Sequence, residues 1–285
     1  MELNAKRVLV AMSGGVDSSV AAALLAEAGW EVRGAFMSLD GEAASPAAED
    51  AARVARAMGI ELDVLDLSAD FAPILDYFTA EYAAGRTPNP CVRCNARLKF
   101  GRLLSHADEI GAKYFATGHH ARIVPGPAGP AIARSAGRGK DQSYVLFAIS
   151  RDVLGRIMLP IGELPDKSVV RQIARQAGLD VHDRPDSQEI CFIPDNDYVS
   201  FLNACFAGDP FLPGPFRDRR GRVLGSHRGI HTVTVGQRRG LRIASERPYY
   251  VLSINPSNRE VVVGREEELF SRGLVARGVT LRGGI

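Results

Sequence analysis

The chain has 285 residues and carries 35 Lys and Arg side chains against 33 Asp and Glu, which gives a formal net charge of +2. That length allows about two domains and supports a sizeable core. The hydrophobic share of 46% and the charged share of 24% are typical of globular proteins and exclude a disordered or collagen-like chain. The sequence has no apolar run of about 18 residues and no signal-peptide pattern, so it predicts a cytoplasmic protein without a transmembrane helix.

Strand and helix patterns alternate over the first 120 residues. The expected strands are 7–12, 32–39, 61–67 and 113–117, and the expected helices are 18–28, 46–58, 69–84 and 95–110. Strands joined by helical crossovers predict an α/β fold with a doubly wound parallel sheet. Ligands of such sheets bind beyond the carboxyl ends of the strands, where the Gly-rich turn after the first strand and Gly118 are expected.

The second half of the chain first continues with helical patterns, over 152–179 and 195–206. After Gly208 the character changes to Pro, Gly and short alternating runs, which predict a small all-β domain. The runs are 230–235, 249–254 and 259–264, with a hairpin turn over 255–258 between the last two. We therefore expect a catalytic domain with a helical insertion over 1–207 and a small β domain over 208–272.

The low net charge conceals an uneven distribution of arginine. Residues 211–242 contain eight Arg and one acid, Asp218, for a local charge of +7, so the rest of the chain sums to −5. An Arg-rich block on an otherwise acidic chain indicates a polyanionic partner. A merely solvated face is the alternative for any charge run taken alone.

A six-residue turn, Ser13-Gly14-Gly15-Val16-Asp17-Ser18, joins the first strand to the first helix. Its glycines let the backbone pass close to an oxyanion, at which the N–H groups of the helix start can point. Asp17 suits a magnesium ion or a helix cap better than a direct phosphate contact. The Gly-x-x-x-x-Gly-Lys loop is absent. A Gly-Gly turn alone is also a common structural feature, whereas the whole string between a strand and a helix is more specific.

The cysteines are distributed in a way that indicates chemistry. Cys91 and Cys94 lie in a Pro-rich loop that runs into a helix, where the helix dipole lowers the thiol pKa of Cys94. Cys191 lies far along the chain, and Cys205, in an apolar helix, is expected in the core. A Cys-x-x-Cys pair can be half of a zinc site, but no second pair at zinc spacing follows. Cys94 and Cys191, joined by folding, fit sulfur transfer better, with one thiolate carrying a persulfide that the other resolves.

The SGGVDS string resembles the pyrophosphate loop of the ATP pyrophosphatase superfamily, which includes amide-forming synthetases and tRNA-modifying enzymes. The chain as a whole resembles one family of it, the tRNA-specific 2-thiouridylases, from residue 7 to about 265 and in the family's order. The matching stretches are RVLVAMSGGVDSSVAA, GRTPNPCVRCNARLKFG, ATGHHARI, KDQSYVLF, LPIGELPDKSVVRQIARQAGL, DSQEICFI and HTVTVGQRRGL.

The resemblance implies ATP-dependent 2-thiolation of the wobble uridine (position 34) of tRNAs for Lys, Glu and Gln. ATP, with Mg²⁺, would activate the uridine O2 as an adenylate. Cys191 would receive a persulfide from an upstream sulfur-relay protein or a cysteine desulfurase, and Cys94 would be the nucleophile that forms a transient disulfide with Cys191. The implied ATP-binding residues are Ala11, Met12, Ser13, Gly14, Gly15, Val16, Asp17, Ser18, Met37 and Gly118. The implied tRNA-binding residues are Asn89, Pro90, Cys91, His119, Lys140, Asp141 and Gln142.

Two departures from the family pattern lead to further expectations. Many members have Asp where this chain has Cys91, so Cys91, Cys94 and Cys191 could instead bind an iron–sulfur cluster, as in some related tRNA thiolases. An inert Cys91 is the alternative. Family members usually continue into another β-barrel, of which 273–285 would be only the start, so part of the tRNA-binding surface would be missing, supplied by another chain, or simply not included in this sequence.

Two other classes of function are compatible with parts of the sequence. A shortened tRNA-binding paralogue with weak or no activity would share the motifs, although intact SGGVDS, Cys94 and Cys191 argue against it. An amide-forming synthetase would use the same loop, but the paired cysteines and the basic β domain would have no role. Pyrophosphate release that depends on tRNA distinguishes the enzyme from the paralogue.

Overall fold

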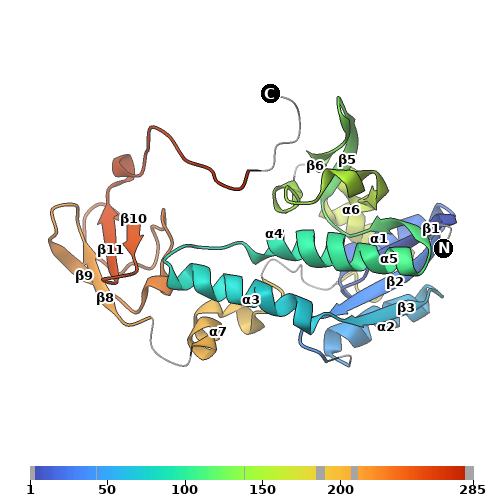
Figure 1. Ribbon diagram of the computed structural model, residues 1–285, viewed down its shortest axis with the longest axis horizontal. Helices are drawn as coiled ribbons and strands as arrows, with labels where there is room; N and C mark the ends of the chain where they lie inside the picture. Colours follow the sequence, from blue (N-terminus) through green and yellow to red (C-terminus); the bar gives the residue numbers. More distant parts are fainter. Residues whose placement is uncertain (1–3, 43, 138, 184–189, 207–210, 280–285) are drawn as a thin grey trace. The chain divides into compact units, whose positions relative to one another are not determined.

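The computed structural model describes residues 4–42, 44–137, 139–183, 190–206 and 211–279 (Figure 1). The chain divides into two compact units. The first takes in Met1–Pro73 and Cys91–Gln188, and the second takes in Ile74–Pro90 and Glu189–Val279. Each unit is therefore made from separate stretches of the sequence. Within the described ranges, no helix is both long enough and apolar enough to cross a membrane.

A five-stranded parallel sheet forms the centre of the first unit, as the sequence predicts. Its strand order is β3-β2-β1-β4-β7. The strands are β1 (Asn4–Ala11), β2 (Glu31–Ser38), β3 (Leu62–Asp66), β4 (Ala112–Ala116) and β7 (Ile157–Met158). In register, Val10 lies opposite Gly34 on one side and Ala116 on the other, so the carboxyl ends of the three inner strands meet at one edge.

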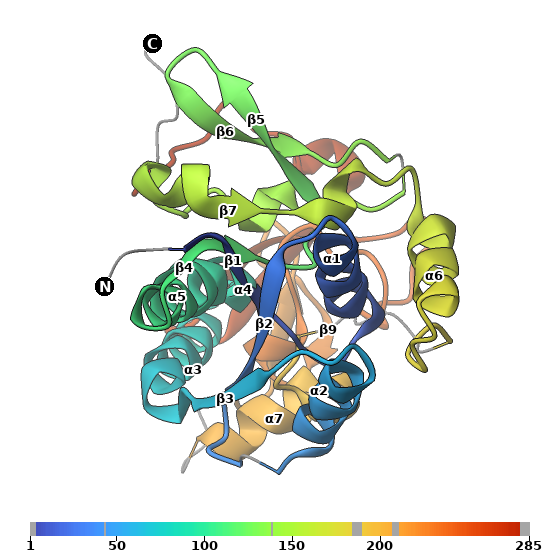
Figure 2. The same ribbon diagram turned by 90° about the vertical axis from the view of Figure 1, so that its right-hand side faces the viewer.

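Helices cover both faces of this sheet (Figure 2). One layer contains α1 (Val16–Glu27), α2 (Pro46–Ala57) and α6 (Lys167–Gln176). Val8 and Val10 of β1 belong to the core of that layer, which also contains Val20 and Val170, all of them fully buried. On the other face Phe115 packs edge-on against Phe100, with ring centroids 5.5 Å apart. Side chains along β1 and β4 thus point alternately to the two faces of the sheet, and on each face they pack against a layer of helices.

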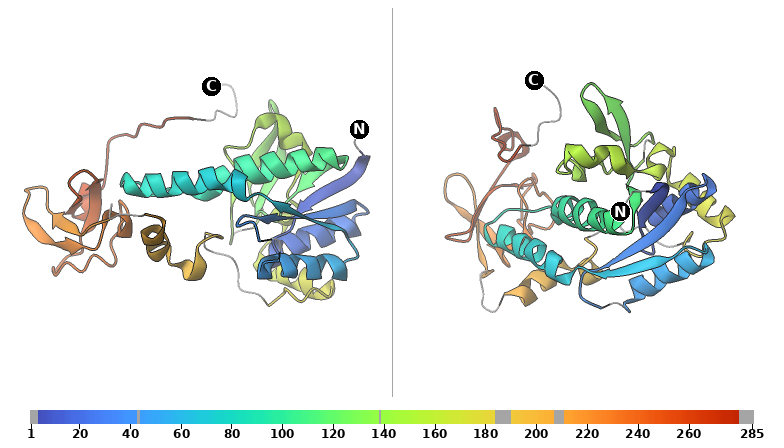
Figure 3. Two further views of the ribbon diagram at one scale, coloured as in Figure 1. Left: turned by 60° about the horizontal axis from the view of Figure 1, so that its bottom comes forward. Right: turned by 45° about the vertical axis from the view of Figure 1, so that its right-hand side comes forward.

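The layer around Phe100 is one continuous helical segment (Figure 3). It comprises α4 (Pro90–Cys94), a π-helical stretch η1 (Asn95–Leu103) and α5 (Leu104–Glu109). The sequence predicts a helix over 95–110, but the helical segment begins at Pro90, five residues earlier. Proline at the first helical position fits the helix, because its missing N–H has no partner there in any case. A π-helical stretch is uncommon and is often found at functional sites.

The long helix expected over 152–179 is wrong for its first half. The chain there forms a 3-10 helix η3 (Arg151–Arg156), strand β7 and a 3-10 helix η4 (Pro160–Glu163) before α6 begins. Proline at 160 and glycine at 162 break the helical pattern, and Gly162 lies so close to Ala121 that a Cβ would clash with its carbonyl. A hairpin of β5 (Ala121–Gly126) and β6 (Gly129–Arg134) and a 3-10 turn η2 (Ser143–Val145) complete the unit.

The second unit contains a four-stranded sheet in the order β10-β11-β8-β9. Its strands are β8 (Gly214–Arg217), β9 (Val223–His227), β10 (Tyr250–Asn255) and β11 (Glu260–Gly264). The predicted hairpin between the last two is confirmed, since β10 and β11 pair antiparallel. The strand expected over 230–235 is wrong, because a 3-10 helix η6 (Ile230–Thr232) occupies its start. Short 3-10 helices η5 (Pro194–Asn196) and η7 (Glu266–Glu268) flank the remaining elements.

Aromatic side chains from distant parts of the sequence form the core of the second unit. Phe78 and Tyr82 come from α3 (Ser68–Ala83), and they pack with Leu202 of α7 (Tyr198–Cys205) and with Phe211 and Phe216. The expected helix over 195–206 is therefore present as α7, three residues shorter at its start. The predicted domain boundary at 207–208 lies outside the described residues, as do residues 280–285 of the final stretch expected over 273–285.

Candidate functional site

The Gly-rich turn lies between the end of β1 and the start of α1. Gly14 has a φ of +72°, and a Cβ there would come within 2.8 Å of Asp50 Cβ, so only glycine fits. Gly15 occupies the N-cap position, where it has no side chain to cap the first N–H groups of α1. The Ser18 hydroxyl accepts a hydrogen bond from the Ser13 N–H at 3.2 Å. An uncapped helix start at the carboxyl end of a parallel strand is a binding site for anions such as phosphate.

Gly118 follows β4, and its backbone lies directly against the same turn. A Cβ at this position would lie 2.6 Å from both the Asp17 carbonyl carbon and the Ser18 nitrogen. Real Cβ atoms do not approach backbone so closely, and therefore Gly118 lets the chain after β4 contact the beginning of α1. Its predicted place next to the Gly-rich turn is thus observed in the structure. Met37, also predicted, is half-buried near the carboxyl end of the neighbouring strand β2.

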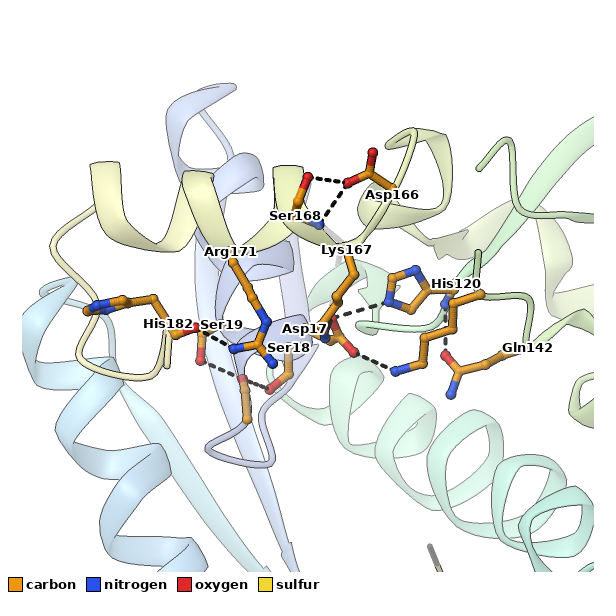
Figure 4. A network of polar contacts seen from close by, with 12 residues as sticks. Asp17, Ser18, Ser19, His120, Gln142, Asp166, Lys167, Ser168, Arg171 and His182 are labelled. Carbon is orange, nitrogen blue, oxygen red and sulfur yellow. Dashed lines mark hydrogen bonds and ion pairs between the residues drawn. The ribbon is translucent and has the colours of Figure 1, made fainter. Parts of the chain in front are cut away.

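Three basic side chains converge on the carboxylate of Asp17 (Figure 4). Lys167 Nζ lies 2.5 Å from Oδ1, Lys140 Nζ lies 3.2 Å from Oδ2, and His120 Nε2 lies 3.2 Å from Oδ1. These residues come from α6, from the loop before η2 and from the turn after β4. Burial by itself would raise the pKa of Asp17, but the adjacent His120 and Lys167 side chains outweigh it and hold that pKa well below its usual value. Asp17 is therefore ionised at any physiological pH.

The loop that carries Lys140 is fixed by its neighbours. Gln142 exchanges two hydrogen bonds with His120: its Oε1 accepts from the His120 N–H at 2.9 Å, and its N–H donates to the His120 carbonyl at 2.8 Å. Asp141 accepts hydrogen bonds from the Ser135 N–H and the Ser143 hydroxyl, at 3.0 and 2.9 Å. Asp141 and Gln142 thus hold the loop, and they position Lys140 against the Gly-rich turn.

His119 differs from its neighbour His120 in its environment. It is 7% exposed, its Nδ1 lies 2.7 Å from the Thr117 hydroxyl, and its ring packs near that of Phe100. Burial, and then the positive charge of Lys99, lower the pKa of His119 well below its usual value, so the ring is neutral at pH 7. A neutral, buried ring is poorly suited to a charged contact with a tRNA phosphate, although the resemblance assigns His119 to the tRNA-binding set.

The cysteines occupy distinct environments. Cys94 is 9% exposed and ends α4, directly before the π-helical stretch, and Cys91 is half-buried in the first turn of the same helix. Because the helix begins at Pro90, Cys94 is its fifth residue, and the expectation that Cys94 lies at the helix N-terminus is wrong. Cys191 is exposed and belongs to the second unit. The expectation that Cys205 is a core residue is also wrong, since it lies exposed at the end of α7.

A hydrogen bond connects the helix of Cys94 to the loop of Lys140. Asn95, 1% exposed, donates from Nδ2 to the carbonyl of Val145 at 3.1 Å, and Val145 belongs to the 3-10 turn that follows Gln142. The Cys94 helix, this loop and the Gly-rich turn are therefore connected by direct contacts in the first unit. Asn89 and Pro90, predicted to contact tRNA, precede Cys91; Asn89 is exposed and Pro90 buried.

Sequence reasoning did not identify His120, Asn95 or Lys167 as site residues. One local signal was available for Lys167: it is the first residue of a helix, a position where acidic side chains are favoured. His120 and Asn95 gave no signal, because their relevance depends on contacts with residues far away in the sequence.

The arginine block divides into two groups in the structure. Arg217, Arg219 and Arg222 pair with Glu260, Glu268 and Asp218, at 2.9, 3.1 and 3.2 Å. The other five are exposed, and the described part of the chain offers them no ion pair; they are Arg220, Arg228, Arg238, Arg239 and Arg242. We call these five side chains the arginine surface. Its charge is available to a polyanion, whereas the first group is neutralised within the unit.

A Gly-rich turn at the carboxyl end of a parallel sheet, next to basic side chains, defines a nucleotide-binding α/β protein. Family models agree: the tRNA methyl transferase HUP domain matches residues 6–195, and the tRNA methyl transferase PRC-barrel domain matches 201–265. The tRNA-specific 2-thiouridylase of Lachnoclostridium phytofermentans is 46% identical over 95% of this chain and 79% of its own length. That of Carboxydothermus hydrogenoformans is 48% identical over 95% of this chain and 78% of its own. The chain belongs to the tRNA-specific 2-thiouridylase family.

Solved structures give a much weaker likeness. The NMN synthetase of Francisella tularensis is 17% identical, with a TM-score of 0.39, and the match covers 64% of this chain and 66% of that one. Agreement at this level carries no argument about function.

Proposed function

We propose that this protein is a tRNA-uridine 2-sulfurtransferase that uses ATP to convert the wobble uridine of tRNA to 2-thiouridine. The observation that carries the proposal is that one unit contains both the Gly-rich turn and the Cys94 helix. A hydrogen bond from Asn95 to Val145 connects this helix to the loop of Lys140, which contacts Asp17 of the turn. An amide-forming synthetase needs the turn but has no use for Cys94. Membership of the 2-thiouridylase family supports the same choice.

The first half of the reaction is adenylation. The O2 atom of uridine attacks the α-phosphorus of ATP, pyrophosphate leaves, and the N3 proton is lost to solvent. The turn from Ser13 to Ser18 binds phosphate oxygens through the N–H groups at the start of α1. Mg²⁺, when bound, neutralises phosphate charge, and the ionised carboxylate of Asp17 fits that ion because carboxylate oxygens are its preferred protein ligands. Gly118 and Met37 belong to the ATP site in this proposal.

The second half of the reaction transfers sulfur. Cys191 carries a persulfide supplied by a sulfur-relay protein or a cysteine desulfurase. The terminal sulfur attacks C2 of the adenylated uridine and AMP leaves. The Cys94 thiolate then attacks the Cys191 sulfur, which breaks the S–S bond to the transferred atom and forms a Cys94–Cys191 disulfide. A thiol reductant resets the pair, so one disulfide is reduced for each uridine thiolated.

Analysis of tRNA nucleosides tests the two-cysteine mechanism. We expect Cys94→Ala and Cys191→Ala each to abolish 2-thiouridine in tRNA from a strain that depends on the variant protein. Cys205→Ala is the matched control, because Cys205 is also an exposed cysteine of the second unit and has no role here. Unchanged 2-thiouridine with Cys191→Ala would refute the mechanism. Pyrophosphate release that requires tRNA separates the enzyme from an inactive tRNA-binding paralogue.

An iron–sulfur route is the second candidate for the sulfur step. Cys91 and Cys94 are three residues apart on α4 and therefore share one side of the helix. Cys191, the third ligand of such a cluster, belongs to the second unit. The absorption spectrum and iron content of anaerobically purified protein distinguish the iron–sulfur route from the two-cysteine route. A colourless, iron-free and active enzyme excludes the cluster.

The proposed substrates are the tRNAs for Lys, Glu and Gln, in the cytoplasm. The arginine surface of the second unit would bind the tRNA backbone, because phosphate contacts position a nucleic acid without reading its sequence. The wobble base would leave the anticodon stack to reach the first unit. We assign Asn89, Pro90 and Cys91 to contacts with the target base, and His119, Asp141 and Gln142 to the loops that receive it.

A further inference from the structure

The segment that leads into the Cys-containing helix is attached to the second unit. Residues 85–89 lie between α3 and α4 and belong to that unit. Gly85 has a φ of +69°, and a Cβ there would lie 2.9 Å from Ile254 Cγ2, so the segment begins in close contact with β10. Further along, the Thr87 hydroxyl donates a hydrogen bond to the Thr234 hydroxyl at 3.0 Å. Two contacts with distant parts of the sequence therefore hold the segment.

Thr234 begins a turn whose backbone is fixed by one glutamine. Gln237 Oε1 accepts a hydrogen bond from the Thr234 N–H at 2.9 Å, and the Gln237 N–H donates to the Thr234 carbonyl at 2.9 Å. The Gly236 N–H donates to the Val251 carbonyl of β10 at 2.8 Å, and the Val251 N–H donates to the Gln237 carbonyl at 3.0 Å. Gln237 Nε2 donates to the Arg239 carbonyl at 2.9 Å. The turn is therefore held at its start, against β10 and at its end.

The side chains that this turn exposes are apolar and cationic. Residues 234–239, which we call the arginine turn, include Val235, 53% exposed, and two members of the arginine surface, Arg238 and Arg239. Guanidinium groups bind phosphate oxygens, and an apolar side chain contacts the edges of bases. A polynucleotide offers both kinds of group at short spacing, whereas an acidic protein surface offers only the charge. The arginine turn therefore fits a nucleic acid.

We propose that the arginine turn and the 85–89 segment form one binding surface for the anticodon loop, and that the hydrogen bond between Thr87 and Thr234 sets their relative position. The inference rests on the proposed action on tRNA. The two arginines of the turn bind phosphates, and the exposed Asn89 contacts a base of the same loop. Thr87 and Thr234 touch no substrate atom in this proposal and are positioning residues.

This arrangement separates the binding of tRNA from the positioning of its base. Loss of the threonine hydrogen bond leaves the arginine turn intact, because Gln237 and β10 still hold it. The 85–89 segment, in contrast, then loses one of its two contacts with the rest of the unit. The affinity for tRNA is therefore retained, while the base occupies its reactive position for a smaller fraction of the time.

Steady-state thiolation of tRNA at saturating ATP tests the proposal on the whole chain. We expect Thr87→Val and Thr234→Val each to lower kcat by about threefold to tenfold, the effect of losing one neutral hydrogen bond, with little change in the KM for tRNA. The double variant should have no lower kcat than either single variant, because both substitutions remove the same bond. Thr234→Ser retains the hydroxyl and should retain the rate.

Thr232→Val is the matched control. The Thr232 hydroxyl also donates a hydrogen bond within the second unit, but to the nearby Gly229 carbonyl, at 2.6 Å. Its loss leaves the bond between the arginine turn and the 85–89 segment in place, so we expect the wild-type kcat. The melting temperature of each variant, followed by circular dichroism, shows whether a lower kcat reflects a loss of folded protein.

The possible failures are distinguishable. If the wild-type chain neither binds tRNA nor thiolates it, the proposed function itself fails. If the wild type is active and both valine variants have its kcat, only the threonine assignment fails. Additive losses in the double variant also overturn the assignment, since they mean that the two hydroxyls act independently. A raised KM with an unchanged kcat, or an equal loss of kcat in Thr232→Val, overturns it as well.

Discussion

Asp17 is the residue on which the largest number of site contacts depend. Its carboxylate contacts Lys140 and Lys167 and carries a negative charge beside the Gly-rich turn, so Asp17→Asn removes a charge that repels a bound anion. We expect this variant to bind inorganic pyrophosphate more tightly than the wild type in buffer without Mg²⁺, by severalfold, and to lose most of its adenylation activity with Mg²⁺. Calorimetry with pyrophosphate and EDTA measures the first effect. Weaker binding of pyrophosphate would contradict this repulsion by the Asp17 carboxylate.

His119 makes the stability of the first unit depend on pH. Burial lowers its pKa, so between that pKa and the unfolded value of about 6.5 the unfolded chain binds more protons than the folded chain. Stability from this residue is complete above about pH 6.5 and is lost as the pH falls. From pH 7.5 to 5.5 we expect a loss of about 1 kcal/mol that His119→Gln does not show. Urea midpoints from the fluorescence of Trp30 measure it, and equal losses in both proteins would contradict it.

Single residues also show how far the sequence determines the site. The Gly-rich turn was predictable, because its glycines are contiguous and lie between a strand and a helix. Gly118 followed from the sheet topology. His120, Asn95 and Lys167 were not predictable in physical terms, since each gains its role from a partner brought near only by the complete fold.

The position of Lys167 depends on how α6 begins. Asp166 caps this helix by accepting hydrogen bonds from the N–H groups of Ser168 and Val169, at 2.7 and 3.2 Å. Asp166→Ala should destabilise the protein by about 1 kcal/mol and also weaken ATP binding, because fraying of the first turn of α6 would move Lys167 away from Asp17 of the Gly-rich turn. Asp197→Ala is the matched control: Asp197 caps α7 in the same way, in the second unit. If both variants bind ATP alike, the start of α6 has no special role.

Among the elements, errors of sequence prediction have two causes. The helix over 152–179 was wrong in its first half because apolar residues at helical spacing also fit two 3-10 helices and a short buried strand. The strand over 230–235 was wrong because tight packing around Gly229, with a φ of +144°, turns the chain into a 3-10 helix instead. Long amphipathic helices such as α2 and regular strands such as β10 were predicted with errors of one or two residues at their ends.

For the molecule as a whole, the distribution of charge predicts how tRNA binding responds to salt. Gln237 donates from Nε2 to the Arg239 carbonyl at 2.9 Å, which fixes the turn that presents Arg238 and Arg239. Replacing both arginines by Gln should weaken tRNA binding and reduce the slope of log affinity against log salt by about 1–2. Replacing Arg217 and Arg222 removes the same charge but from arginines already paired with Glu260 and Asp218. A similar slope for both double variants would contradict the role of the arginine surface.

The core that α3 shares with α7 has a practical consequence for dissecting the protein. Phe78 and Tyr82 precede Cys91 in the chain, yet they pack with Leu202 and Phe211, which follow Cys191. Cutting the gene at a single codon between the two family-model matches would therefore leave these aromatic rings without their covering residues, and the N-terminal fragment should aggregate. Biochemists who want an isolated ATP-binding half would have to replace residues 74–90 with a short polar linker as well as remove the C-terminal part.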